Sequence, residues 1–222
     1  MELEALKSWR KSERTRLIAE REALPAAIVD ECRRRIDAHL ERAFPGLGST
    51  TFALCWPIRN EYDARHVAKT FRERGASTAL PVVVAPRAPL VFREWHAGVR
   101  LERGPLDIPY PVGSPELTPK VVLLPMNGWD AAGYRLGYGG GFFDRTLAAS
   151  SPRPVVIGVT YEMARLDTIH PQAWDIPVDY VVTERGVYRR DEGRLAFLGE
   201  PGPVSELASP VCYADERILR GG

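Results

Sequence analysis

The residues best suited to chemistry lie in one short stretch, GYRLGYGGGFFDRTLAA, at positions 133–149. Four of five consecutive positions are glycine, namely Gly137, Gly139, Gly140 and Gly141. The apolar run 121–124 precedes them as a buried strand, and residues 142–149 have the composition of a short helix. Open backbone N–H groups beside a helix N-terminus attract anions. Phosphate is therefore the first ligand to consider, although such a loop also serves simply as a tight turn.

Charged side chains surround the glycines. The spacing matches neither the P-loop, which ends in Gly-Lys-Ser/Thr, nor the dinucleotide pattern GxGxxG. Arg135 and Arg145 flank the loop, and Asp144 falls in the first turn of the predicted helix. That carboxylate would repel a phosphate held by the same N–H groups unless a cation lies between them. The combination predicts a nucleotide phosphate with magnesium.

The elements that must position this loop begin with two helices in residues 3–44, broken near Pro25. In the first helix, cations fall at i, i+4, i+7 and i+14: Lys7, Lys11, Arg14 and Arg21. This cationic stripe either faces the glycine loop or is an ordinary solvated surface. The second helix carries an apolar stripe that predicts a core face: Ile28, Cys32, Ile36, Leu40 and Phe44.

Strands and helices alternate after residue 50. Strands are expected at 51–56, 78–85, 89–95, 121–124, 154–160 and 179–183, with a helix at 64–74 that Asp63 caps and Gly75 ends. Alternation of this kind predicts a single three-layer α/β domain with an N-terminal helical pair and a mostly parallel central sheet flanked by helices. Ligands bind such sheets at the carboxyl ends of the strands.

Domain boundaries follow from the same pattern. Residues 104–120 contain five prolines and are predicted to be a loop, but strands of the same character continue on both sides. We therefore expect one domain over 1–199. Residues 200–222, rich in Pro, Gly and Ser, are expected to form an extended arm.

Composition narrows the class of protein. The chain has 222 residues and a formal net charge of +1, which argues against broad nucleic-acid binding. Its three cysteines form no CxxC pair, so neither a disulfide framework nor a zinc site is indicated. No apolar run is long enough to span a membrane. We expect a cytoplasmic protein that needs neither nucleic acid, membrane nor an obligate protein partner.

Five segments together carry a family resemblance: KSER at 11–14, WPIRNEYD at 56–63, FREW at 92–95, DAAGYRLGYGGGFFDR at 130–145 and WDIPVDYVVTE at 174–184. In their order and spacing they resemble the 5-formyltetrahydrofolate cyclo-ligase family, also called methenyltetrahydrofolate synthetases. The resemblance spans roughly residues 7–188. Its most specific part is the RLGYGGG block with the two aromatic residues, Asp and Arg that follow it.

The resemblance implies an enzyme that uses ATP and Mg²⁺ to convert 5-formyltetrahydrofolate to 5,10-methenyltetrahydrofolate, with release of ADP and phosphate. Phosphorylation of the formyl oxygen supplies a leaving group, N10 attacks, and phosphate departs. Such chemistry requires mainly positioning and charge neutralisation. This fits a sequence that shows no catalytic serine, cysteine or histidine constellation.

The resemblance also implies roles for individual residues. The nucleotide would be bound by Lys11, Arg14, Arg135, Gly137, Tyr138, Gly139, Gly140, Gly141, Phe142 and Phe143, and magnesium by Asp144 and Asp175. Arg135 and Arg145 are the predicted catalytic residues. The reduced folate would contact Glu61, Trp56, Trp95 and Tyr138, because a pterin offers donors to a carboxylate and a flat face to aromatic rings. Core packing is the alternative role for these aromatic residues.

The sequence departs from the family pattern at four positions, Tyr110, Phe143, Ala164 and Trp174, where the family often has Glu, Tyr, Gln and His. Each change removes a polar or ionisable group close to a motif. Lys7 and Arg10 also compete with Lys11 and Arg14 for the family's N-terminal roles. Two other readings stay open: a folate- or nucleotide-binding protein without ligase activity, and an enzyme that acts on a sugar phosphate.

Overall fold

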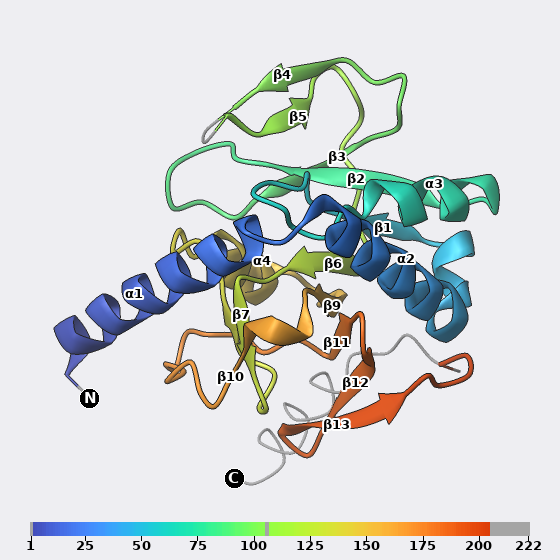
Figure 1. The fold of residues 1–222 in the computed structure, drawn as a ribbon. Coiled ribbons are helices and arrows are strands. Elements are labelled where there is room, and N and C mark those ends of the chain that lie inside the picture. The colour runs from blue at the N-terminus through green and yellow to red at the C-terminus, as the bar shows by residue number, and fades with distance from the viewer. Residues whose placement is uncertain (1, 105–106, 205–222) are drawn as a thin grey trace, which may run out of the picture.

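The structure is a computed structural model that describes residues 2–104 and 107–204 (Figure 1). Its α-helices are α1 (Leu3–Glu22), α2 (Ala26–Ala43), α3 (Arg65–Glu73) and α4 (Phe142–Ala149). The first two form the predicted helical pair, which breaks at Pro25 because proline has no N–H to continue a helix and favours its start. Pro45–Ser49 and Glu162–Ala164 form short 3₁₀ turns.

The central sheet has eight strands in the order β13-β12-β11-β9-β6-β1-β2-β3. Its strands are β1 (Thr51–Ala53), β2 (Ser77–Val82), β3 (Val91–Glu94), β6 (Val121–Pro125), β9 (Val155–Val159), β11 (Tyr180–Thr183), β12 (Gly186–Asp191) and β13 (Arg194–Gly199). The middle strands β2, β1, β6, β9 and β11 are parallel, whereas β3, β12 and β13 pair antiparallel at the two edges. The predicted mostly parallel sheet is confirmed.

Alternating side chains of the central strands enter two separate cores. Val121 and Leu123 of β6 pack in the core that contains Ile36 of α2 and Phe71 of α3. Val122 and its alternate neighbours pack in the second core, with residues of α1 and α4. Because successive strand residues point to opposite faces, helices cover both sides of the sheet. The three layers predicted from the sequence are therefore present.

Several short strands were not predicted. β4 (Leu101–Arg103) and β5 (Pro109–Pro111) form a hairpin, so the prediction of a loop over 104–120 was wrong at residues 109–111. β7 (Gly128–Asp130), β8 (Arg135–Leu136) and β10 (Arg165–Leu166) form a small separate sheet. Strands of two or three residues are too short to show a period in the sequence. The β12–β13 hairpin also lay outside the predicted strands.

Local details also differ from the expectations. The strand expected at 51–56 ends at Ala53, although the Leu54 N–H still donates to the carbonyl of Ala79 in β2 at 3.0 Å. Ile28 is 43% exposed, so the apolar stripe of α2 reaches the core only from Cys32 onward. At the start of α3, Asp63 Oδ1 accepts the N–H of Arg65 at 3.0 Å.

The expected C-terminal arm lies mostly outside the described residues, and its separation from 1–199 stays a prediction. Residues 201–204 form no helix or strand, and the Val204 N–H donates to the carbonyl of Ala43 at 2.7 Å. Among the helices of the described ranges, none combines the length and apolar character that crossing a membrane requires. The cytoplasmic location also stays a prediction.

Candidate active site

A cavity of about 840 Å³ opens at the carboxyl ends of β1, β2 and β6. Strand β1 pairs with β2 on one side and with β6 on the other, so the chain order of the parallel strands reverses at β1. The loops that leave neighbouring strands therefore separate there and create a crevice. Residues that follow β1, including Trp56 and Glu61, form one wall, and the glycine loop forms another. The predicted position of the ligand site, at the carboxyl ends of the strands, matches this cavity.

The glycine loop, residues 137–141, joins β8 to α4. The preceding strand is thus the short β8 and not 121–124, as the sequence indicated. Gly139 has φ +90°, and Gly141, at the N-cap of α4, has φ +63° and ψ 16°. A Cβ on Gly139 would lie 3.3 Å from Arg14 Nη2, and one on Gly141 would lie 2.8 Å from Arg145 Nη1. Two guanidinium groups therefore rest directly on the loop backbone, and a Cβ at either glycine would crowd one of them.

The cationic stripe of α1 divides between the cavity and solvent. Arg14 Nε donates to the carbonyl of Gly137 at 2.6 Å, and Arg14 lines the cavity together with Arg10. Burial and the nearby charge of Arg10 lower the pKa of Arg14. The Lys11 side chain is exposed, and that of Lys7 pairs with Glu4 at 2.7 Å. The arginines of this helix, and not its lysines, are the cations beside the glycine loop.

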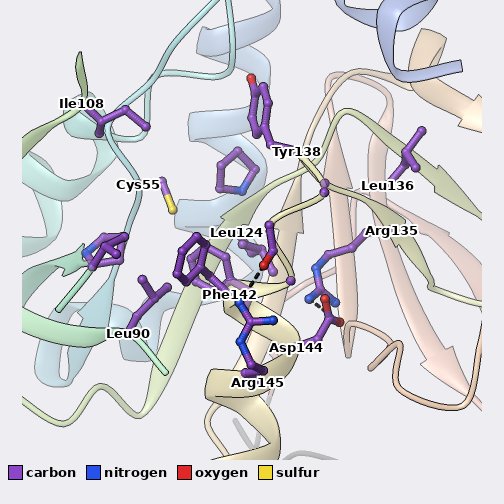
Figure 2. A pocket seen from close by; sticks show the side chains of 18 of the residues that line it. Cys55, Leu90, Ile108, Leu124, Arg135, Leu136, Tyr138, Phe142, Asp144 and Arg145 are labelled. Atoms are coloured by element: carbon purple, nitrogen blue, oxygen red, sulfur yellow. Dashed lines mark hydrogen bonds and ion pairs between the residues drawn. The ribbon is translucent and has the colours of Figure 1, made fainter. Parts of the chain in front are cut away.

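Two acid–arginine pairs form the charged end of the cavity, and Figure 2 shows one of them, Arg135 with Asp144. Asp144 Oδ1 accepts hydrogen bonds from Arg135 Nη2 at 2.8 Å and from the N–H of Ile176 at 3.1 Å. Arg10 Nη2 donates to Asp175 Oδ2 at 2.6 Å, and the same oxygen accepts the N–H of Gln172 at 2.7 Å. These contacts tie α1, α4 and the loop 172–176 together around the cavity.

Arg135 and Arg145, the predicted catalytic pair, differ in their surroundings. The Arg135 side chain is only 6% exposed, and burial lowers its pKa although Asp144 opposes this effect. Arg145 Nη2 donates to the carbonyl of Gly140 at 2.6 Å, and its guanidinium carbon lies 5.2 Å from the centre of the Phe142 ring. Arg145 Nε is buried and has no hydrogen-bond partner within the described residues. Arg145 therefore retains donor capacity beside the loop.

Glu61 and Tyr138 meet on the far side of the loop. The Glu61 side chain is 3% exposed; its Oε1 accepts the Tyr138 hydroxyl at 2.8 Å, and its Oε2 accepts the N–H of Ile58 at 3.1 Å. Burial raises the pKa of Glu61, and the charge of Arg21 opposes that rise. Burial and the charge of Glu61 raise the pKa of the Tyr138 phenol, which therefore stays protonated and donates to the carboxylate.

The opposite end of the cavity is largely apolar. Its lining includes Cys55, Leu90 and Ile108, which Figure 2 shows, together with Trp56 and Tyr110. The Arg65 guanidinium carbon lies 4.4 Å from the centre of the Trp56 ring. From the sequence, core packing was the alternative role for Trp56. Trp95 is 6% exposed and packs edge-on against Trp56, with 6.1 Å between ring centres, one layer behind the cavity wall. Trp95 is not among the residues that line the cavity, so its predicted contact with folate stays a prediction.

A magnesium ion fits the charged end through Asp144 better than through Asp175. In the described part of the chain, Asp144 Oδ2 accepts no hydrogen bond, whereas both oxygens of Asp175 accept hydrogen bonds from Arg10. No group of three or more His, Cys, Asp and Glu side chains among residues 2–104 and 107–204 is arranged to hold a metal. Magnesium commonly binds through one or two carboxylates together with substrate phosphates and water. The donor set is compatible with that mode.

The positions that depart from the family pattern are not equally close to the site. Tyr110, Phe143 and Trp174 line the cavity, and Trp174 is 60% exposed. Ala164 is buried in the second core. From the sequence, Trp174 was named only as a departure from the family pattern and not as a site residue. Nothing in the local pattern shows that loop 172–176 contacts α1, as it does through Asp175 and Arg10.

Comparisons with known proteins agree with this geometry. Residues 6–184 match the 5-formyltetrahydrofolate cyclo-ligase family. The chain is 31% identical to the 5-formyltetrahydrofolate cyclo-ligase of Mycolicibacterium smegmatis, over 78% of this chain and 93% of that protein. It is 28% identical to the enzyme of the same name from Escherichia coli, over 65% of this chain and 83% of that protein.

A solved structure gives the same result. The NMR structure of Aquifex aeolicus 5,10-methenyltetrahydrofolate synthetase superimposes with a TM-score of 0.72 and 26% identity, over 83% of this chain and 94% of that one. The fold, the cavity at the reversal of strand order and the arginine-flanked glycine loop thus accompany a match over most of the chain. This chain belongs to the 5-formyltetrahydrofolate cyclo-ligase family.

Proposed function

We propose that this chain converts 5-formyltetrahydrofolate to 5,10-methenyltetrahydrofolate in a reaction that consumes ATP, requires Mg²⁺ and releases ADP and phosphate. One observation carries the proposal: a single cavity joins a charged end, formed by the glycine loop and its arginines, to an apolar end beside the buried carboxylate of Glu61. A phosphoryl donor and a flat, partly apolar acceptor can therefore lie next to each other.

The charged end suits the ATP phosphates. Arg14 and Arg145 rest against the glycine backbone, and arginine binds phosphate oxygens through charged, directional hydrogen bonds. Arg145 Nε, buried and without a partner among the described residues, is a donor that a phosphate oxygen could use. Arg135 is held by Asp144, so its charge is fixed in place before ligands bind. Preorganised cations stabilise charge on a transferring phosphoryl group without rearrangement.

Asp144 would hold magnesium, with Asp175 close by in the same network. Bound there, the ion would neutralise charge on the ATP phosphates. The Lys11 side chain is exposed, so in the proposed nucleotide site its positive charge would attract the phosphates only from a distance.

The apolar end suits the reduced folate. Both Glu61 oxygens already accept one hydrogen bond each, but a carboxylate has about four lone-pair sites, so donors of a pterin edge can be added. Trp56 offers a ring on the same wall, and Tyr138 belongs to both ends because it lies in the glycine loop and donates to Glu61. The formyl group would then lie near the phosphates, where N10 can attack it after activation. Water exclusion by the apolar wall protects the activated group.

The test is a complete reaction mixture of protein, ATP, Mg²⁺ and 5-formyltetrahydrofolate, followed by the near-ultraviolet absorbance of the methenyl product and by ADP release. Product should form only when every component is present, and turnover should collapse in Asp144→Asn. Asparagine keeps an oxygen that can accept hydrogen bonds from the Ile176 N–H and from Arg135 Nη2, so these contacts can persist while the negative charge is removed. Asp167→Asn, an exposed carboxylate, is the matched control and should remain active.

The rival function is a folate- or nucleotide-binding protein without ligase activity. The changes at Tyr110, Phe143 and Ala164 favour it. Tyr110 and Phe143 line the cavity, whereas Ala164 is buried in the core. Tight folate binding without ATP consumption, across a range of enzyme concentrations, would refute the ligase and support this rival.

A further inference from the structure

Arg21 is a buried cation that the proposed reaction does not use. It lies in the last turn of α1, is 5% exposed and does not line the cavity. Its Nε donates to the carbonyl of Arg59 at 2.8 Å, and its Nη1 donates to Asn127 Oδ1 at 2.9 Å. Burying a guanidinium costs free energy unless an opposite charge lies nearby, so a buried Arg21 is expected to have a carboxylate partner.

That partner charge is Glu61. Arg21 Nη2 lies 3.8 Å from Glu61 Oε1 and donates to the Tyr138 hydroxyl at 3.1 Å. The hydroxyl in turn donates to Glu61 Oε1 at 2.8 Å. A phenol can accept one hydrogen bond and donate one, so the three side chains form a directed chain from the cation through the phenol to the carboxylate.

The surroundings of Glu61 leave Arg21 as its main opposing charge. Arg59 of the same turn adds a smaller attraction, whereas burial raises the pKa of Glu61. The thiol of Cys55 and the phenols of Tyr138 and Tyr161 also face Glu61 and are themselves raised in pKa by burial, so they are neutral. Without Arg21, only the weaker effects of the Ile58 N–H, the Tyr138 hydroxyl and the charge of Arg59 would oppose the effect of burial on the Glu61 pKa.

We propose that Arg21 is a positioning residue that holds Glu61 as a carboxylate and fixes the Tyr138 phenol toward it from behind the cavity wall. Because Tyr138 belongs to the glycine loop, one cation sets both the carboxylate that receives the folate and the loop that receives the phosphates. The inference rests on the proposed function only in naming folate as the partner of Glu61.

The first test needs no ligand. The Glu61 carboxyl carbon is followed by ¹³C NMR as a function of pH, with its resonance assigned by its absence in Glu61→Gln. Arg21→Met should move the Glu61 titration to higher pH, whereas Arg16→Met should leave it unchanged. Arg16 is the matched control because it lies on the same helix and pairs with Glu13 and Glu20.

The second test separates positioning from general support of the fold. At neutral pH, Arg21→Met should bind 5-formyltetrahydrofolate about tenfold more weakly, the equivalent of about 1.4 kcal/mol. Binding should recover as pH rises and Glu61 ionises, and Arg21→Lys should restore it. A merely structural role would weaken binding by a similar factor at every pH.

The outcomes remain distinguishable if a variant or the proposed function fails. Should Arg21→Met not fold, Arg21→Gln removes the charge but keeps an N–H donor and should give the same titration shift. A Glu61 carboxyl that is still protonated at pH 7.5 in the parent, or one that titrates alike in Arg21→Met and Arg16→Met, overturns the inference. If the titration shifts as expected but folate never binds, the proposed function fails and the link between Arg21 and Glu61 stands.

Discussion

Replacement of Gly141 by alanine isolates what the glycine loop requires. Gly141 adopts φ +63° and ψ 16°, a left-handed conformation that costs a non-glycine residue roughly 1–2 kcal/mol. Its new Cβ would lie 2.8 Å from Arg145 Nη1, so the guanidinium must move and give up its bond to the Gly140 carbonyl, a further loss of about 1 kcal/mol. A less flexible unfolded chain offsets about 0.4–1 kcal/mol. The free energy of unfolding should therefore fall by about 2 kcal/mol.

The assay is thermal unfolding of Gly141→Ala beside Gly137→Ala. A Cβ on Gly137 would meet no atom within 4 Å, and its φ lies outside the left-handed region, so this control should change stability by less than about 0.5 kcal/mol. For a domain of this size, about 2 kcal/mol corresponds to a Tm lower by roughly 4–8 °C. Calorimetric titration with ATP and Mg²⁺ should also show weaker binding in Gly141→Ala, because Arg145 is displaced. Equal Tm values for the two variants would refute the argument from backbone geometry.

The remaining predictions concern the two faces of α1, the cavity rim and the core. Arg14→Ala should weaken ATP binding roughly tenfold or more by calorimetry, because a charged hydrogen bond contributes about 1.5–3 kcal/mol. Lys11→Ala, at an exposed position, should change the affinity less than about threefold, and equal losses would contradict the conclusion that only the arginines of α1 face the loop. Acrylamide quenching of tryptophan fluorescence should decrease when ligands fill the cavity, and this protection should be much smaller in Trp174→Phe, since Trp174 lines the cavity and is 60% exposed. Ile157→Ala should lower the free energy of unfolding by about 2–5 kcal/mol in urea titrations, because Ile157 is fully buried between sheet and helices; a loss below about 1 kcal/mol would mean that the core closes around the gap.

The sequence was most informative where a local pattern and its physical cause lie in the same few residues. α4 begins at Phe142 and ends at Ala149, as its composition indicated, because the glycine before it and the loop after it act locally. The uninterrupted apolar runs of β6 and β9 predicted strands buried on both faces, and the two helix-facing cores confirm this. The glycine loop, with Arg145 and Asp144 beside it, could likewise be read directly.

Pairing partners and helix rotation were decided by the tertiary structure. β5 contains two prolines and forms a strand only because β4 lies beside it, and β8 has two residues whose pairing depends on β7. The stripe of α1 was correctly spaced, but its spacing could not tell which cations face inward. Packing against the sheet turns Arg14 and Arg21 toward the loop and leaves Lys11 in solvent.

The site also combines features that the local sequence determines with features that only the tertiary structure decides. The sequence by itself determined the chemical groups: glycines, arginines and carboxylates at spacings that belong to one strand-turn-helix unit. Only the tertiary structure decided which groups meet, because Glu61, Tyr138 and Arg21 come from three segments far apart in the chain and Arg10 meets Asp175 across 165 positions. Contacts of this kind depend on the order of the strands and on how the helices pack over them, and neither is encoded in any local period of the sequence.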